Sequence, residues 1–116
     1  MAIVNRSAVI VRPRAPYLAW TQCNDGEGLA EPVFESMRND PNTFLVPSWD
    51  GDTGRKAILE QAWPLLFELM LECWVTDETQ WPERRTREMF DEWFELIVSE
   101  VIEDLVPGEP LRDPED

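Results

Sequence analysis

The side chains in this sequence that could take part in chemistry are almost all carboxylates. The chain contains 24 Asp and Glu residues, 2 Cys residues and no His. The absence of histidine excludes Ser-His-Asp and Cys-His nucleophilic sites, paired-histidine zinc sites and carboxylate–histidine di-iron sites. Paired carboxylates remain for general acid–base or metal-dependent catalysis. Because so many acids provide a suitable pair in any fold, the pattern specifies no reaction.

Two other patterns have simpler interpretations than a reactive site. Residues 50–54 resemble the start of a calcium-binding loop, but Arg55 replaces the required Gly and Gln61 replaces the bidentate Glu. We therefore interpret this segment as the cap of a helix. Cys23 and Cys73 lie far apart, which predicts two reduced thiols used in packing rather than a disulfide framework. No phosphate-binding glycine loop occurs, and we predict no cofactor.

The acidic residues are concentrated in the C-terminal half of the chain. Residues 57–116 contain seventeen Asp and Glu residues against four Lys and Arg residues, and residues 88–111 contain no basic residue at all. The formal net charge of the whole chain is −14. Such a charge repels nucleic-acid phosphates and anionic membranes, and it favours basic partners, cations or solubility. We therefore expect no nucleic-acid partner and no membrane partner.

The densest run of acids lies in a predicted last helix, which Thr86 caps and Pro107 ends. Apolar residues recur there at helical spacing from Phe90 to Leu105. Residues 98–106 are also rich enough in β-branched side chains to form a strand instead. The polar side of the predicted helix carries Glu88, Asp91, Glu92, Glu95, Ser99, Glu100, Glu103 and Asp104.

This predicted acidic face breaks local rules of helix stability. Like charges at positions i and i+4 each destabilise an isolated helix by ~0.2–0.5 kcal/mol. The simpler interpretation is a solvated face that keeps the protein soluble, with its repulsion screened by salt. Otherwise the face binds a partner or meets arginines elsewhere in the fold. Candidates for such internal counter-charges are Arg6, Arg12, Arg14, Arg38, Arg84, Arg85 and Arg87.

The linker before this helix, residues 76–85, carries a candidate interface anchor. Trp81 stands between two acids and an arginine pair, and a Trp beside an Arg is typical of interface anchors. The simpler interpretation is that Trp81 folds back over the junction between the two long helices. The candidate partner-binding residues are Asp77, Glu78, Trp81, Arg85, Glu88, Asp91, Glu92 and Glu95.

The elements that position these residues are predicted in the order strand, helix, strand, helix, helix. The β-branched runs 7–12 and 43–46 predict the two strands. A short helix begins near Pro16 and ends near Cys23, and residues 26–32 are expected to form a surface loop. Residues 33–38 fit either a helical turn or an extended stretch.

A long amphipathic helix follows the capping segment. Apolar residues recur at helical spacing from Ile58 to Trp74. Pro64 lies on the polar face, where it bends the helix, and a break into two helices at Trp63 is the alternative. We therefore predict an α+β fold in which a small two- or three-stranded sheet packs against two long helices.

The size of the chain is that of one domain. With 116 residues, of which 43% are hydrophobic, it can bury a core. We predict a single compact domain over residues 1–106 and a mobile, acidic, Pro-rich tail over residues 107–116. No signal-peptide pattern and no apolar run of the ~20 residues that span a membrane occurs, so we expect a cytoplasmic protein.

Several segments of the chain carry a resemblance to a known group of proteins. Residues 5–13 and 74–86, together with Met89-Phe90 and Trp93-Phe94, resemble a family of small acidic bacterial proteins of unknown function. The likeness covers most of the chain apart from residues 24–40 and the tail. It implies a compact bacterial cytoplasmic domain and says nothing about a mechanism.

These observations favour a non-catalytic protein-interaction module with an acidic helical face. Its partner would be a second copy of itself or a basic protein. One alternative is a small acidic inhibitor, either an immunity-type protein or a mimic of DNA. The other alternative is an enzyme that uses carboxylates, with or without a divalent metal.

Overall fold

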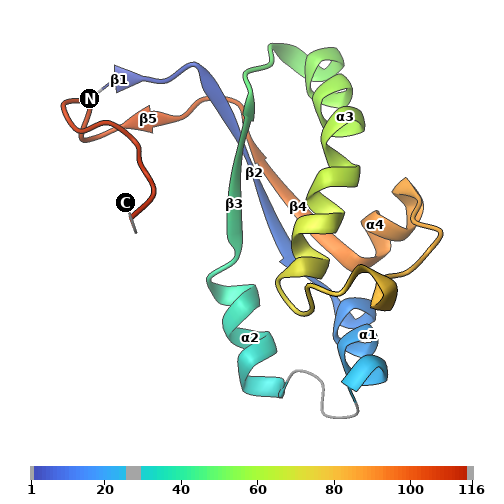
Figure 1. The fold of residues 1–116 in the computed structure, drawn as a ribbon. Helices are drawn as coiled ribbons and strands as arrows, with labels where there is room; N and C mark the ends of the chain where they lie inside the picture. The colour runs from blue at the N-terminus through green and yellow to red at the C-terminus, as the bar shows by residue number, and fades with distance from the viewer. Residues whose placement is uncertain (1, 26–29, 115–116) are drawn as a thin grey trace.

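The computed structural model describes residues 2–25 and 30–114 (Figure 1). It confirms the predicted α+β class, since helices pack on one side of a small antiparallel sheet. The elements are β1 (Ala2–Ile3), β2 (Arg6–Pro13), α1 (Ala15–Asp25), α2 (Glu31–Asn39), β3 (Asn42–Pro47), α3 (Gly51–Glu72), the 3-10 helix η1 (Glu78–Gln80), α4 (Arg87–Trp93), β4 (Phe94–Ser99) and β5 (Glu103–Asp104).

The main sheet has β2 at its centre, in the antiparallel order β3-β2-β4. Val9 of β2 lies opposite Phe44 of β3 and Val98 of β4, and all three side chains belong to the face that the helices cover. The short strands β1 and β5 pair with each other as a separate two-stranded ribbon, which we call the arm. The arm leaves the sheet at the Arg6 end of β2 and projects away from the helices (Figure 1).

The core between α3 and the sheet is built around aromatic rings. Phe67, Phe90 and Phe94 form a triangle with ring centroids 5.3–5.6 Å apart. Tyr17 joins them at 5.3 Å from Phe94. All four rings are buried and meet in tilted or edge-on arrangements, the geometry that ring quadrupoles favour. One aromatic cluster therefore ties α1, α3, α4 and β4 together.

The long helix α3 continues through its proline. It runs unbroken for 22 residues with Pro64 inside it, so the alternative of a break at Trp63 does not occur. Pro64 is exposed, and the carbonyl that it leaves without a donor lies on the solvent side of the helix, where water can hydrate it.

The predicted last helix is wrong beyond its second turn. α4 ends at Trp93, and the chain continues directly as β4, with β5 following over residues 103–104. Phe94, Leu96 and Val98 alternate toward the core, and β4 pairs along the second edge of β2. This pairing satisfies backbone groups of a buried strand, so it overrides the helical period of the apolar residues. The alternative of a strand over residues 98–106 anticipated only the end of this change, and α3 is the sole long helix among the described residues.

Smaller differences concern the connections. The predicted loop over residues 26–32 is shortened by α2, which begins at Glu31 with Pro32 in its first turn, where a proline fits well. Residues 26–29 of that loop lie outside the described residues.

Cys23 and Cys73 are free and exposed, so they are not packing residues. The tail over residues 107–114 forms neither helix nor strand. None of the helices in the described ranges is long and apolar enough to cross a membrane.

A buried phenol closes the C-terminal end of α3 and gives a test of the fold. The hydroxyl of Tyr17 donates to the carbonyl oxygen of Met70 at 2.8 Å, one of the last-turn carbonyls that a helix cannot satisfy by itself. Burial, with a smaller contribution from the charge of Cys73, raises the pKa of Tyr17 above its ordinary value of 10.0. The unfolded chain therefore ionises this phenol at a lower pH than the folded chain does.

We predict that the free energy of unfolding falls as the pH rises above about 10, because ionisation of Tyr17 favours the unfolded state there. Tyr17→Phe should remove part of this pH dependence. At neutral pH the same substitution should cost about 1–3 kcal/mol, since the Met70 carbonyl loses its buried donor. Urea denaturation at a series of pH values measures both effects. Identical pH profiles for the two proteins would contradict the assignment.

Candidate functional site

The face of the main sheet turned away from α3 and α4 carries exposed apolar side chains on both of its edge strands. We call it the open face. Leu45 is 50% exposed and Ile97 is 42% exposed, although both lie on strands of a three-stranded sheet. Side chains directly opposite each other in register share one face of a sheet. By that register the open face carries Arg6, Ala8, Ile10, Arg12, Thr43, Leu45, Pro47, Glu95, Ile97 and Ser99.

The open face continues onto the arm. Leu45 lines an open hollow of about 210 Å³ together with Val4, Ile102, Glu103, Asp104, Leu105 and Leu111. On the arm, in which we include Leu105 directly after β5, Ile3 is 72% exposed and Leu105 is 75% exposed. A two-stranded ribbon of this kind is marginal on its own in water. The arm therefore extends the apolar surface of the sheet with side chains that nothing in the described part of the chain covers.

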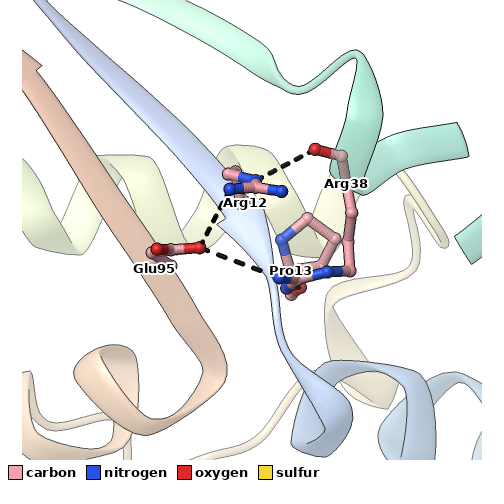
Figure 2. Close-up of polar contacts among 4 residues, drawn as sticks. All are labelled: Arg12, Pro13, Arg38 and Glu95. Carbon is pink, nitrogen blue, oxygen red and sulfur yellow. Dashed lines mark hydrogen bonds and ion pairs between the residues drawn. The ribbon is translucent and has the colours of Figure 1, made fainter. Parts of the chain in front are cut away.

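At the opposite end of β2, α2 meets the open face through a cluster of three charged side chains (Figure 2). Nη1 of Arg12 lies 3.3 Å from Oε1 of Glu95, and Nη2 of Arg38 lies 3.8 Å from the same oxygen. Arg12 and Glu95 face each other directly across β2 and β4, the register at which opposite charges stabilise a sheet.

The same two arginines also hold backbone oxygens. Nε of Arg12 donates to the carbonyl oxygen of Arg38 at 2.9 Å, and Nη1 of Arg38 donates to the carbonyl oxygen of Pro13 at 2.7 Å. These bonds join α2 to the end of β2 (Figure 2). The cluster thus fixes the position of α2 and sets one boundary of the open face.

The cluster has an excess of positive charge. Two guanidinium groups share one carboxylate, and among residues 2–25 and 30–114 no second acid lies within ion-pair distance of either arginine. Guanidinium groups present several N–H donors in a plane, which suits carboxylates. In a chain of net charge −14, this end of the open face is a place where another carboxylate is tolerated.

The predicted anchor Trp81 is not available to a partner. It is only 9% exposed and belongs to the core, where its ring N–H donates to the carbonyl oxygen of Val75 at 2.8 Å. The guanidinium carbon of Arg85 lies 5.8 Å from the centroid of the Trp81 ring, and Nη2 of Arg85 lies 3.2 Å from Oε1 of Glu68. The ring folds back onto the protein, as the simpler interpretation of this linker expected.

The acids that precede Trp81 remain at the surface. Asp77 caps η1, and its Oδ1 accepts hydrogen bonds from the hydroxyl of Thr79 at 2.7 Å and from the backbone N–H of Thr79 at 3.0 Å. The hydroxyl bond and then the backbone bond lower the pKa of Asp77. Glu78 is exposed in η1. Both residues therefore have a local structural explanation that requires no partner.

The predicted acidic face does not form, because its residues lie on α4, on β4, directly after β4 and on the arm. Glu88, Asp91 and Glu92 are exposed on α4, where Asp91 pairs with Arg87 at 3.0 Å. Glu95 lies on the open face. Glu100 accepts a hydrogen bond from the first N–H of α3 at 3.2 Å, while Glu103 and Asp104 belong to the arm.

Sequence reasoning missed Leu45 and Ile97 as surface residues, and it named Arg12 and Arg38 only among the candidate counter-charges. The signal for Ile97 was the alternation of Glu95, Ile97 and Ser99, which has the period of a strand. The helical spacing of the neighbouring aromatic residues concealed it.

Comparison with known protein families, with curated proteins and with solved structures finds no match for this chain. The resemblance to small acidic bacterial proteins therefore stays a prediction. Within the described ranges, no group of three or more Cys, Asp and Glu side chains is placed to hold a metal ion.

We predict that Glu95→Gln destabilises the protein by about 0.5–1 kcal/mol, the upper range for partly exposed ion pairs. The substitution leaves Arg12 and Arg38 facing each other without a counter-charge. This loss of unfolding free energy should be smaller in 1 M NaCl, because the Debye length there is about 3 Å and salt screens the ion pairs. Urea denaturation at low and high salt measures it.

Glu92→Gln is the matched control, because Glu92 is an exposed acid with no ion pair to any residue that the structure describes. It should be neutral or slightly stabilising, since it removes one negative charge from an acidic chain. Equal effects of the two substitutions would show that the ion pairs of the cluster contribute nothing specific to the free energy of unfolding.

Proposed function

We propose that this protein is a non-catalytic protein-interaction module that works as a homodimer, with a second copy packed on the open face. The observation that supports this is the apolar surface that runs from Leu45 and Ile97 of the sheet onto the arm. Contiguous apolar surface of this kind on a soluble protein marks an interaction site.

Charge favours a second copy as the occupant of the open face. Two chains of net charge −14 repel each other, so they can meet only where acids are few. On the three strands of the main sheet, Glu95 is the one acid whose side chain lies on the open face, and Arg12 and Arg38 neutralise it. The acids Glu103 and Asp104 lie on the arm. The exposed acids of α4 and η1 lie outside this face. A contact between two open faces therefore avoids much of the repulsion.

The size of the surface requires the arm to take part. Three strands of about six residues measure roughly 14 by 20 Å from the ordinary strand spacing and rise. That is small against the roughly 800 Å² that each partner buries in a stable complex. The arm supplies the missing area with Ile3 and Leu105, which nothing in the described residues covers.

The charges also favour one orientation of the two copies. Antiparallel sheets pack face to face about 10 Å apart, and a two-fold axis makes the same patch meet itself. If the axis crosses the strands, the Arg12–Arg38 end of each copy meets the arm of the other. Glu103 lines the same hollow as Leu45, so it faces the partner's cations in this arrangement.

We predict that the wild-type protein is a dimer in solution, with a dissociation constant of about 1 µM or tighter. Leu45→Lys should convert it to a monomer with an unchanged circular dichroism spectrum, because Lys in the contact loses apolar area and carries an unpaired charge. Light scattering coupled to size exclusion measures the mass. Leu65→Lys is the matched control, since Leu65 is also exposed, at 60%, but lies on α3, and it should leave the dimer intact. A wild-type protein that stays monomeric at high concentration would contradict the proposal.

A second prediction tests the orientation. Glu103→Lys should weaken the dimer about tenfold or more, because it turns an attraction to the partner's arginine cluster into a repulsion. Glu83→Lys changes the net charge by the same amount at an exposed position in the linker before α4, and it should strengthen the dimer slightly or leave it unchanged. Sedimentation equilibrium compares the two variants. If both behave alike, the copies do not meet in the proposed orientation.

A further inference from the structure

A second surface, on the helix-covered side of the sheet, gathers cations that the sequence leaves scattered. A hollow of about 380 Å³ lies between α3, α4 and β4. Four of the ten Lys and Arg residues of the chain line it: Arg14, Arg55, Lys56 and Arg87. The concentration is notable because the chain as a whole is strongly acidic.

Acids only partly neutralise these cations. Arg87 pairs with Asp91 at 3.0 Å and with Glu60 at 3.6 Å. The contact of Arg55 with Asp52 spans 3.5 Å, and the Asp52 side chain is 87% exposed, so water screens that pair strongly.

The other two cations are unpaired with respect to the described acids. Arg14 and Lys56 are exposed and form no ion pair with any acid in the described ranges. The hollow therefore has positive charge available for a ligand.

The floor of this hollow is apolar and follows β4. Leu59, Leu96 and Val98 line it and are half-buried. A neighbouring hollow of about 240 Å³ shares Arg55 and Val98 with it and reaches Glu100. The two hollows together form a groove along β4. Cations line it, and so do three acids, of which Asp52 and Asp91 pair with Arg55 and Arg87 while Glu100 accepts a hydrogen bond from α3.

The strand beside this groove is an open edge. In the described part of the chain no strand pairs with the outer side of β4 (Figure 1). The other edge strand, β3, follows Pro41 and ends at Pro47, and prolines protect an edge because they block pairing. β4 has no proline and no lysine, and its one charged side chain, Glu95, is turned to the open face.

We propose that β4 and this groove bind an extended acidic segment of a partner protein by strand addition. In such a complex the segment pairs with the free backbone edge of β4, and every second side chain points into the groove. Carboxylates at these positions meet Arg14 and Lys56, and an apolar side chain between them covers Leu59.

The groove suits a peptide better than a nucleic acid. Its apolar floor offers nothing to a phosphodiester backbone. A polyanion that fills the groove would also meet Asp52, which lines it, and the exposed acid Glu60, which pairs with Arg87. The inference goes beyond the homodimer and does not rest on it, since the groove and the open face lie on opposite sides of the sheet.

The test uses a fluorescein-labelled peptide about eight residues long, to match a strand, in which every second residue is in turn Glu and Val and the residues between them are Thr. Fluorescence polarisation should show binding that weakens with salt, as expected for exposed charges. Combined Arg14→Ala and Lys56→Ala should weaken binding about tenfold or more. Combined Arg84→Ala and Arg112→Ala, which makes the same change in net charge outside the groove, should leave it unchanged.

Three comparisons sharpen the outcome. The same peptide with N-methyl groups at alternate residues should not bind, because it cannot pair with an edge strand. The peptide with Lys in place of Glu should not bind either, and a short single-stranded oligonucleotide should not compete. Binding that survives N-methylation, or that both double variants weaken equally, would overturn strand addition into the groove. An oligonucleotide that competes fully with the peptide would indicate a general anion-binding site in place of strand addition.

The monomeric Leu45→Lys protein should still bind the peptide. This separates the two proposals, because loss of the dimer then leaves the groove intact, and loss of peptide binding in the groove variants leaves the dimer intact. Peptide binding that is lost in Leu45→Lys would contradict the independence of the two surfaces.

Discussion

The backbone of β2 lies buried between two neighbours, and its N–H and C=O groups need partners on both edges. Ser7, Val9 and Val11 are fully buried, so water cannot supply those partners. β3 pairs along one edge and β4 along the other. This requirement turns the chain from helix to strand at Trp93 and brings Phe94 into the aromatic cluster. It also sets Glu95 opposite Arg12, so the charge cluster at the end of the open face follows from the same pairing.

The sheet separates two surfaces of different character. The helix-covered side has a groove lined by cations, while the open face is apolar with one neutralised acid. β4 belongs to both, since its odd and even side chains point to opposite sides. A change of register by one residue would exchange Leu96 with Ile97 and place Glu95 in the core. The pairing of β4 with β2 is therefore what keeps the two surfaces distinct.

The sequence contained enough information for the parts of the fold that local pattern decides. The run of β-branched residues in β2, the amphipathic period of α3 and the tolerance of Pro64 on its polar side all follow from short-range physics. Residues 94–99 could not be assigned in this way. Their apolar side chains satisfy a helical period and a strand period at once, and the open edge of β2 decides between them.

The candidate site was less accessible to sequence reasoning for a related reason. Counting charges showed that acids dominate the C-terminal half, but it could not show that Glu95 shares two arginines from β2 and α2. Those three residues are brought together only by strand pairing and by the position of α2. Similarly, Arg14 lies between β2 and α1, Arg55 and Lys56 lie side by side on α3, and Arg87 begins α4. No spacing in the sequence connects these three places.

The arm has a consequence for how the chain is made. Ala2 pairs with Asp104, so β1 cannot form its strand pairing until a much later part of the chain has been translated. β2 likewise waits for residues 94–99 before its second edge is covered. Contacts between segments so distant in the chain form late and slowly. The open face is thus complete only after β4 has left the ribosome, and a nascent chain stalled before β4 would present the bare edge of β2 to chaperones.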